Sequence, residues 1–367
     1  MHIVHTESSC GWGGQEIRVL EEATGMLARG HRVTLLCPRE APIFDAAARR
    51  GVPAVALPIA RKGLRGLRAL RAWLARERCD VLNSHSSTDS WLAALALARM
   101  KPRPALVRTR HISAATPKNF ATRWLYQSAT QRIVTTGERL REQLIRDNGY
   151  RPESIVSVPT GIDLARYAPA DRGEAKARLG LDKRRACVGI VATLRSWKGH
   201  RYLVEAFAGL GQKDACLLMV GDGPGRAGLV EQVARLGLEA RVLMPGNQAD
   251  VTPWLQALDV FALPSYANEG VPQALMQAMA VGMPVISTPV GSIDELVRHE
   301  ETGLMVPPRD ADALRAAIER LLDGPALGDR LARAARARVR ERYSRERMLD
   351  DMEAVFREAA ACCSVQR

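Results

Sequence analysis

The feature that most constrains the fold of this 367-residue sequence is a strand–helix rhythm that stops and then restarts. In the first part, short apolar runs such as MHIVH (1–5), RVTLLC (32–37) and DVLNSH (80–85) alternate with stretches whose apolar residues recur at helical spacing. Strands that alternate with helices in this way pair in parallel, with the helices on both faces of the sheet. The sequence therefore predicts an α/β fold.

A segment rich in proline and glycine, residues 154–173, interrupts this rhythm before a second series of strands and helices begins. We therefore expect two doubly wound, Rossmann-like domains, residues 1–165 and 166–344, with a ligand in a cleft between the carboxyl ends of their strands. The tail is predicted to be helical. Residues 345–367 are expected to cross back and complete the first domain.

The net charge of +13 is concentrated in the first part of the chain. Residues 1–160 hold 25 Lys and Arg against 13 Asp and Glu, whereas the remainder holds 28 against 27. This asymmetry indicates a face that meets an anionic partner. The stretch RKGLRGLRALRAWLARER (61–78) reads either as a helix with a basic outer face or as a membrane-surface contact. Nucleic acid is not an expected partner, because aromatic residues make up only 5% of the chain.

The sequence favours a cytoplasmic protein without metal or disulfides. No apolar run approaches the roughly 18 residues of a membrane span, and the start MHIVHTESSCGWGG lacks the features of a signal peptide. None of the seven cysteines forms a CxxC pair, so no zinc site is indicated. Cysteines 10, 37, 79, 187 and 216 are predicted to be small core residues.

Two turns between a strand and a helix occupy matching places in the two halves. GWGG (11–14) opens the first helix, where backbone N–H groups can meet an anion or a hydroxyl, although a plain tight turn explains it equally well. LRSWKGH (194–200) begins the second half. There Arg195 and Lys198 are placed to converge on a phosphate, with a solvated loop as the alternative.

Two histidines of the first half add a further candidate site. His85 and His111 each follow a predicted strand, and the two strands are neighbours in the series. A single histidine in such a place is usually structural. Two of them at neighbouring carboxyl ends indicate either a site or a pair of structural histidines.

The segment EGVPQALMQ (269–277) places an acid and an amide on one helix. Pro272 suits the first turn of a helix, which puts Glu269 in the loop at the helix start. The backbone N–H groups of Gly270 and Val271 then face outward and offer an anion or hydroxyl site. Gln277, more than one turn further on, is a solvated side chain, a satisfied core amide or the second half of a ligand site.

Over nearly its whole length the sequence resembles the GT-B glycosyltransferases of family 4, retaining enzymes that use nucleotide sugars. The segments that carry this resemblance are GWGGQEIRVLEEATGMLARGHRVTLL, DVLNSHSS, VPTGIDLARY, LRSWKGH, LMVGDGP and PSYANEGVPQALMQAMAVGMPVISTPVGSIDELV. Each is weakly specific alone, but together their order and spacing are specific. The resemblance implies that the first domain binds the acceptor and the second binds the donor.

The resemblance also implies roles for single residues. The family pattern E-x7-E falls on Glu269, implied to contact the donor sugar, and on Gln277, implied to approach the ribose. Lys198 is implied to bind the diphosphate. The other implied positions are Thr193, Arg195, Asn247, Gly270, Val271 and Gly14 for the donor, Gly13, His85 and Arg110 for the acceptor, and His111 beside the sugar. Glu269, His111 and Lys198 are the expected catalytic residues.

Two positions depart from the family pattern. Gln277 replaces a glutamate, and Thr193 stands where relatives carry an arginine five residues before the diphosphate lysine, although Arg195 is near enough in sequence to replace it. An amide keeps much of a ribose contact, whereas a lost cation removes stabilisation of a departing diphosphate. The replacement at Thr193 is therefore expected to lower activity more than the replacement at Gln277.

These features predict a retaining transfer of a sugar from a nucleoside diphosphate sugar to a hydroxyl acceptor. The expected acceptor is a glycolipid or a precursor of lipopolysaccharide or another cell-envelope polysaccharide, at an anionic membrane surface that the basic first domain contacts. No cofactor or metal is expected, since no DxD motif is present. A nucleotide-sugar 2-epimerase and a nucleotide-sugar-binding protein with impaired catalysis are the alternatives.

Overall fold

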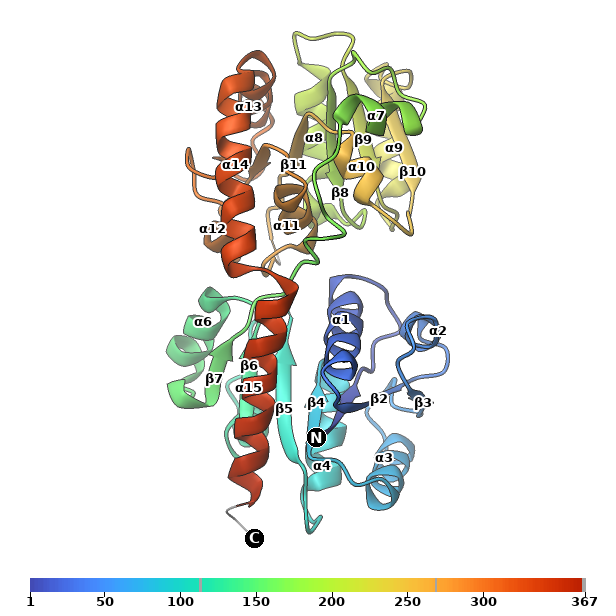
Figure 1. Cartoon of the computed structure of the whole chain (residues 1–367), viewed down its shortest axis with the longest axis vertical. Coiled ribbons are helices and arrows are strands. Elements are labelled where there is room, and N and C mark those ends of the chain that lie inside the picture. Colours follow the sequence, from blue (N-terminus) through green and yellow to red (C-terminus); the bar gives the residue numbers. More distant parts are fainter. Residues whose placement is uncertain (112–113, 268, 365–367) are drawn as a thin grey trace. The chain divides into compact units, whose positions relative to one another are not determined.

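The computed structural model describes residues 1–111, 114–267 and 269–364 and shows two compact units (Figure 1). Unit 1 comprises Met1–Gly161 and Glu346–Arg367, and unit 2 comprises Ile162–Arg345. These limits lie four residues and one residue from the domain limits expected at 165 and 345. Each unit is an α/β structure built on a parallel sheet.

Unit 1 holds a sheet of seven strands in the order β3-β2-β1-β4-β5-β6-β7. Every neighbouring pair in it is parallel, so the carboxyl ends of its strands lie at one edge. The strands are β1 His2–Thr6, β2 Arg32–Cys37, β3 Ala54–Ala56, β4 Val81–Ser84, β5 Ala105–Arg110, β6 Arg132–Thr135 and β7 Ile155–Ser157. Polar side chains that follow β1, β4 and β5 therefore gather at a shared edge.

The helices of unit 1 bury apolar faces against this sheet. They are α1 Gly14–Ala28, α2 Pro42–Arg49, α3 Leu64–Arg76, α4 Ser87–Leu97, α5 Phe120–Trp124, α6 Glu138–Asn148 and α15 Arg345–Ser364. Met352 and Phe356 of α15 are buried in the same core as Ile3 of β1. Helices α1 and α15 pack closely at Gly25, where an added Cβ would lie 2.4 Å from a methyl carbon of Leu349.

Unit 2 holds a sheet of six parallel strands in the order β10-β9-β8-β11-β12-β13. Its strands are β8 Cys187–Val191, β9 Cys216–Val220, β10 Val242–Gly246, β11 Val260–Leu263, β12 Val285–Ser287 and β13 Leu304–Met305. Its helices are α7 Arg172–Arg178, α8 His200–Ala208, α9 Arg226–Arg235, α10 Thr252–Gln256, α11 Gln273–Ala280, α12 Ile293–Leu296, α13 Ala311–Asp323 and α14 Pro325–Arg342. Both sheets are therefore doubly wound and parallel, as the rhythm of the sequence predicted.

Several details differ from the sequence-based expectation. Strand β7 lies inside the segment read as an interruption, whereas the tail is helical as predicted and consists of α14 and α15. Cys10 is exposed, so the prediction that it is a core residue was wrong, whereas Cys79 is partly buried and packs against the core. Cys10 belongs to the loop beyond the carboxyl end of β1, and the sheet does not cover that loop.

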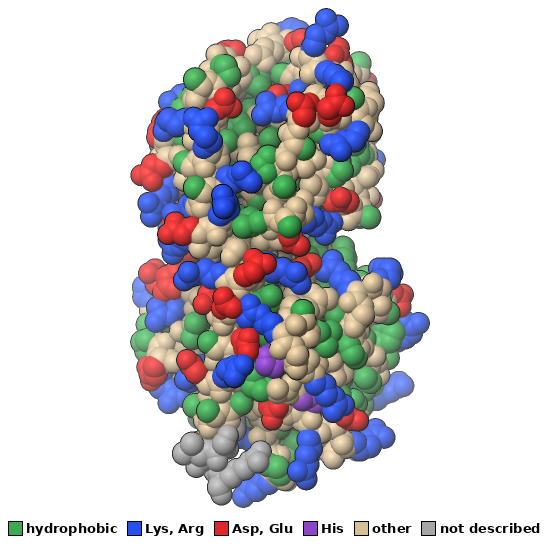
Figure 2. Space-filling model, in the orientation of Figure 1, with side chains coloured by type: hydrophobic (Ala, Val, Ile, Leu, Met, Phe, Trp, Pro, Cys, Tyr) green, Lys and Arg blue, Asp and Glu red, His purple; other side chains and the backbone are tan. Residues whose placement is uncertain are grey.

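Helix α3 carries a basic outer face. Gly66, Leu70, Trp73 and Leu74 are buried, whereas the arginines at 65, 68, 71 and 76 are all exposed. Lys and Arg side chains gather over this region on the face drawn in Figure 2. Within the described residues, no helix combines the length and apolarity needed to cross a membrane.

Candidate active site

Lys198 and Glu269 form an ion pair at the edge of the unit 2 sheet. Lys198 follows β8 and Glu269 follows β11, and these strands are neighbours. The Lys198 Nζ lies 2.7 Å from Oε1 and 3.0 Å from Oε2 of Glu269, and Ser265 Oγ donates a 2.6 Å hydrogen bond to the same Oε1. The Glu269 side chain is 4% exposed and that of Lys198 21%. The lysine is therefore the more accessible end of a nearly buried pair.

Two glycines allow the loops that carry this pair to approach each other. Gly199 has a φ of +77°, and an added Cβ would lie 2.0 Å from the backbone oxygen of Pro264. Gly291 has a φ of +62°, and an added Cβ would lie 2.0 Å from the backbone oxygen of Glu269. Left-handed backbone and this proximity both require glycine. The position of Glu269 thus depends on a glycine 22 residues later in the chain.

The loop after Glu269 leads into α11. Gly270 is partly exposed and the Val271 side chain is buried. Pro272 takes the cap position just before the helix, one residue earlier than the first-turn position that its sequence context suggested. A proline there leaves no orphan N–H of its own at the helix start.

Gln277 is buried on α11 and contacts a tyrosine of the same unit. Its side chain is 8% exposed, and its Nε2 donates a 3.0 Å hydrogen bond to Tyr167 Oη. This contact satisfies one of the two amide donors, as expected for a buried amide. Gln277 is therefore not a solvated side chain, while a ribose contact stays a prediction.

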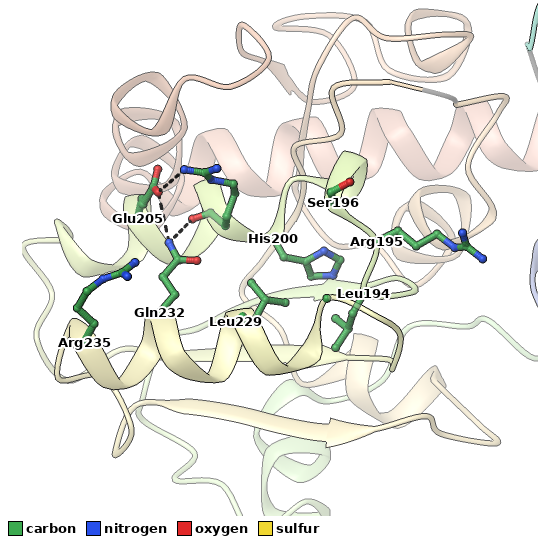
Figure 3. A pocket seen from close by; sticks show the side chains of 11 residues that line it. Leu194, Arg195, Ser196, His200, Glu205, Leu229, Gln232 and Arg235 are labelled. Carbon is green, nitrogen blue, oxygen red and sulfur yellow. Dashed lines mark hydrogen bonds and ion pairs between the residues drawn. The ribbon is translucent and has the colours of Figure 1, made fainter.

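The other positions predicted for the donor lie in exposed turns. Thr193, Arg195 and Asn247 are all exposed, after β8 and β10. The Arg195 guanidinium lies over the Trp197 ring at 5.1 Å. In Figure 3 its side chain points away from Glu205 on α8. Nothing in the described contacts ties Arg195 to an acid, so the guanidinium is available to an anion.

A cavity of about 350 Å³ lies beside this turn, between α8 and α9 (Figure 3). His200 lies inside it and is 3% exposed, and neither of its ring nitrogens has a hydrogen-bond partner among the described residues. Burial, and then the neighbouring Lys198, lower the pKa of His200 to about 4. The ring is thus neutral and offers one donor and one acceptor to a small polar group.

The corresponding edge of unit 1 holds two buried carboxyl groups. Asp89 on α4 accepts hydrogen bonds from Thr6 Oγ1 and Ser8 Oγ, and Glu7 accepts a 2.6 Å bond from Ser86 Oγ. Burial raises the pKa of Asp89 to about 6, and burial with the nearby Asp89 raises the pKa of Glu7 to about 7. A serine-lined cavity of about 500 Å³ adjoins them.

Some of the site residues that the sequence predicted in unit 1 lie together at this edge. Gly13 is the N-cap of α1 and Gly14 its first residue, at the end of the loop after β1. The imidazole rings of His85 and His111 are hydrogen-bonded, Nδ1 to Nε2, at 3.0 Å. Arg110 instead turns inward, donating to Tyr126 Oη at 2.7 Å and to the backbone oxygen of Ala114.

Known protein families match both halves of the chain. The model for Glycosyltransferase Family 4 matches residues 12–166, and that for Glycosyl transferases group 1 matches residues 171–338. A D-inositol 3-phosphate glycosyltransferase of Rhodococcus opacus (strain B4) is 31% identical, over 95% of this chain and 86% of its own length. The chain belongs to the family 4 glycosyltransferases.

A further relative and two solved structures are also similar to this chain. An Escherichia coli UDP-Gal:alpha-D-GlcNAc-diphosphoundecaprenol alpha-1,3-galactosyltransferase is 28% identical over 80% of this chain and 81% of its own. A Rickettsia africae glycosyltransferase superposes with a TM-score of 0.88 at 20% identity, covering 98% of each chain. Anabaena Alr3699/HepE in complex with UDP-glucose gives 0.86 at 21%, covering 98% of this chain and 100% of its own. The predicted GT-B fold and glycosyltransferase identity are confirmed.

Some residues at the carboxyl-terminal edges of the two sheets were not predicted as site residues from the sequence. Ser265, Tyr167 and Glu7 all contact predicted or neighbouring site residues. Ser265 and Tyr167 lie within segments that carry the family resemblance, but the sequence assigned neither of them a role. An acid directly after a buried strand was the available signal for Glu7.

Across the described residues no group of three His, Cys, Asp or Glu is placed to hold a metal ion.

Proposed function

We propose that this glycosyltransferase moves a sugar from a nucleoside diphosphate sugar to a hydroxyl acceptor with retention at the anomeric carbon. The observation that carries the proposal is the nearly buried pair of Lys198 and Glu269, held by Ser265 at neighbouring strand ends. The cation suits the diphosphate of such a donor, and the acid suits the hydroxyl groups of its sugar. The direct test is transfer itself, with the anomer of the product determined by NMR.

The two charged groups take different parts of the donor in this proposal. Lys198, the more exposed partner, turns toward the diphosphate and stabilises the negative charge that grows as the glycosidic bond breaks. Glu269 then accepts hydrogen bonds from the sugar hydroxyls. Arg195 and the N–H groups of Gly270 and Val271 add positive potential, and the departing phosphate takes the acceptor proton. The reacting carbon develops oxocarbenium character, as in other glycosyl chemistry.

The remaining donor positions orient the nucleotide. Gln277 approaches the ribose, and the backbone around Asn247 meets the base. A UDP sugar is the donor class that the relatives favour, because the E. coli galactosyltransferase and the Anabaena complex both carry UDP sugars in their names. The buried amide of Gln277 keeps the donor site neutral at this position.

Gln277→Glu tests the ribose contact. A carboxylate that accepts from a ribose hydroxyl makes a charge-assisted hydrogen bond, stronger than the neutral one by about 1 kcal/mol, so donor affinity should rise roughly fivefold. Tyr167 can turn its hydroxyl to donate to the new carboxylate. Isothermal titration with UDP-glucose and UDP-galactose measures the change, and Gln256→Glu on α10 is the matched control. Unchanged affinity in Gln277→Glu would remove Gln277 from the donor site.

The acceptor we propose is a glycolipid or another cell-envelope saccharide precursor at an anionic membrane surface. The E. coli relative acts, by its name, on a diphosphoundecaprenol-linked sugar. Helix α3 presents exposed arginines at 65, 68 and 71 beside Leu64, whose side chain is 68% exposed. Arginines flanking an exposed apolar residue suit the headgroup region of such a membrane.

Replacing Arg65, Arg68 and Arg71 together by glutamine should weaken binding to anionic liposomes. Each arginine near the surface contributes about 1 kcal/mol, so the triple variant should bind roughly 100-fold more weakly. Cosedimentation with vesicles containing phosphatidylserine measures this, at two salt concentrations because screening weakens the attraction. The matched control replaces three exposed arginines of unit 2, at 178, 333 and 340. Equal binding by both triple variants would contradict the assignment to α3.

A further inference from the structure

Three histidine rings form a continuous hydrogen-bonded chain inside unit 1. His5 Nδ1 lies 3.0 Å from His85 Nε2, and His85 Nδ1 lies 3.0 Å from His111 Nε2. The planes of the His5 and His85 rings are inclined by only 22°. His5 is fully buried, His85 is 5% exposed and His111 is partly exposed. The chain therefore runs from the core to the edge where the acceptor-side residues lie.

A buried carboxyl group stands at the inner end of this histidine chain. Glu22 of α1 is fully buried, and its Oε1 accepts a 3.1 Å hydrogen bond from Asn83 Nδ2. The same oxygen lies 3.9 Å from His5 Nδ1, close enough for electrostatic attraction but not for a hydrogen bond. Arg18, also fully buried, lies 3.8 Å from the other Glu22 oxygen. Oε1 is thus fixed as an acceptor that faces His5 Nδ1.

The hydrogen bonds along the three neutral histidine rings can run in either of two directions. In one direction each ring carries its proton on the nitrogen that is bare in the other direction. If each ring donates outward, His5 carries its proton on Nδ1, toward both Glu22 and His85. If each ring donates inward, His5 carries it on Nε2, which is buried and has no hydrogen-bond partner among the described residues. Orphaned buried N–H groups are rare because they cost most of a hydrogen bond. The inward direction also sets the Nδ1 lone pair against the Glu22 oxygen.

We propose that Glu22, acting through His5 and His85, fixes His111 as the Nδ1–H tautomer, so that His111 donates a hydrogen bond to a bound hydroxyl or phosphate oxygen and does not act as a base. Glu22, His5 and His85 are positioning residues in this scheme. Only His111 would touch a substrate. The part that concerns substrate rests on the proposed function, whereas the tautomer is a property of the protein alone.

The surroundings of the histidine chain keep its three rings neutral. Burial lowers the pKa of His5 to about 3. Burial, the two neighbouring histidines and Arg18 lower the pKa of His85 well below its usual value, and burial with Arg18 does the same for His111. Burial raises the pKa of Glu22 to about 7, so Glu22 orients the chain most strongly above that pH. Asp89 accepts a hydrogen bond from the backbone N–H of His85, and the Phe356 ring of α15 packs against His5 at a steep angle.

The test is ¹⁵N NMR of the full chain labelled on its histidine rings, at pH 8 without substrate. Protonated and bare ring nitrogens resonate far apart, so the spectrum reports each tautomer directly. The expected result is an Nδ1–H signal for both His85 and His111. Wild-type protein with Nε2–H at His111 would overturn the proposal, whether or not sugar transfer is later observed.

Two variants at His5 separate the effect of its N–H donor from the effect of its side-chain packing. His5→Asn places an amide N–H near the position of Nδ1 and should keep the Nδ1–H signal of His111. His5→Phe supplies no donor and should give His111 a mixture of tautomers. His2→Phe is the matched control, because His2 lies on the same strand, is 7% exposed and bonds Thr34 outside the chain. A His111 signal unaffected by His5→Phe would also overturn the proposal.

Discussion

Replacing Lys198 by alanine should lower kcat for sugar transfer by about 10²- to 10³-fold. Removing one preorganised group that stabilises a departing anion typically has this effect, because the charge grows only as the bond breaks. The donor's affinity should fall less than kcat. The variant also leaves Glu269, which is 4% exposed, without its cation, at a cost to the free energy of unfolding on the order of 3 kcal/mol.

A matched control separates these two effects. Lys213→Ala removes an exposed lysine from the loop before β9 and should leave kcat, KM and the melting temperature unchanged. Turnover of Lys198→Ala is then compared with wild type at a temperature where circular dichroism shows both to be folded. A folded Lys198→Ala protein with wild-type kcat would contradict the proposed role of Lys198.

Gly291→Ala should destabilise the protein strongly. The substituent would lie 2.0 Å from the backbone oxygen of Glu269, and the residue has a φ of +62°. Backbone strain costs about 1–2 kcal/mol and the clash adds to it, so the total loss in free energy of unfolding should be on the order of 4 kcal/mol. Because relief of the clash moves Glu269, activity should fall as well. Urea denaturation and an activity assay measure the two effects.

Gly237→Ala isolates the backbone contribution. Gly237 has a similar φ of +65° in the same unit, but an added Cβ would meet no atom within 4 Å. This variant should lose only about 1–2 kcal/mol and keep its activity. Equal losses from both glycine variants would show that the close approach at Glu269 is not a constraint.

The sequence predicted the two parallel α/β units because their pattern is local. Each buried parallel strand reads as a short apolar run, and each covering helix shows apolar residues at helical spacing. The same pattern located His85 and His111, which directly follow such runs, and Lys198 and Glu269, which lie in the loops between such a run and the next helix. The short strand β7 was missed because it lies beside the proline- and glycine-rich segment, where local signals conflict.

Contacts between distant residues could not be predicted in this way. The need for glycine at position 291 arises only when its loop meets Glu269, and nothing in the neighbouring residues signals it. Likewise, His5 and Glu22 read as single polar residues in an apolar strand and in an amphipathic helix. Their relation to His85 depends on the packing of α1 against β1 and β4. Tyr167, the partner of Gln277, is 110 residues away in the chain.

The most direct test of the central claim is the anomer of the sugar first released when the donor is hydrolysed without acceptor. The full chain is incubated with UDP, GDP and ADP sugars, and ¹H NMR follows the nascent sugar before it mutarotates. The account predicts release of the nucleoside diphosphate and a sugar with the donor's anomeric configuration, at a rate that falls by about 100-fold or more in Lys198→Ala and also falls in Glu269→Ala. An inverted anomer, a sugar epimerised at carbon 2, or turnover equal to that of both variants would contradict it.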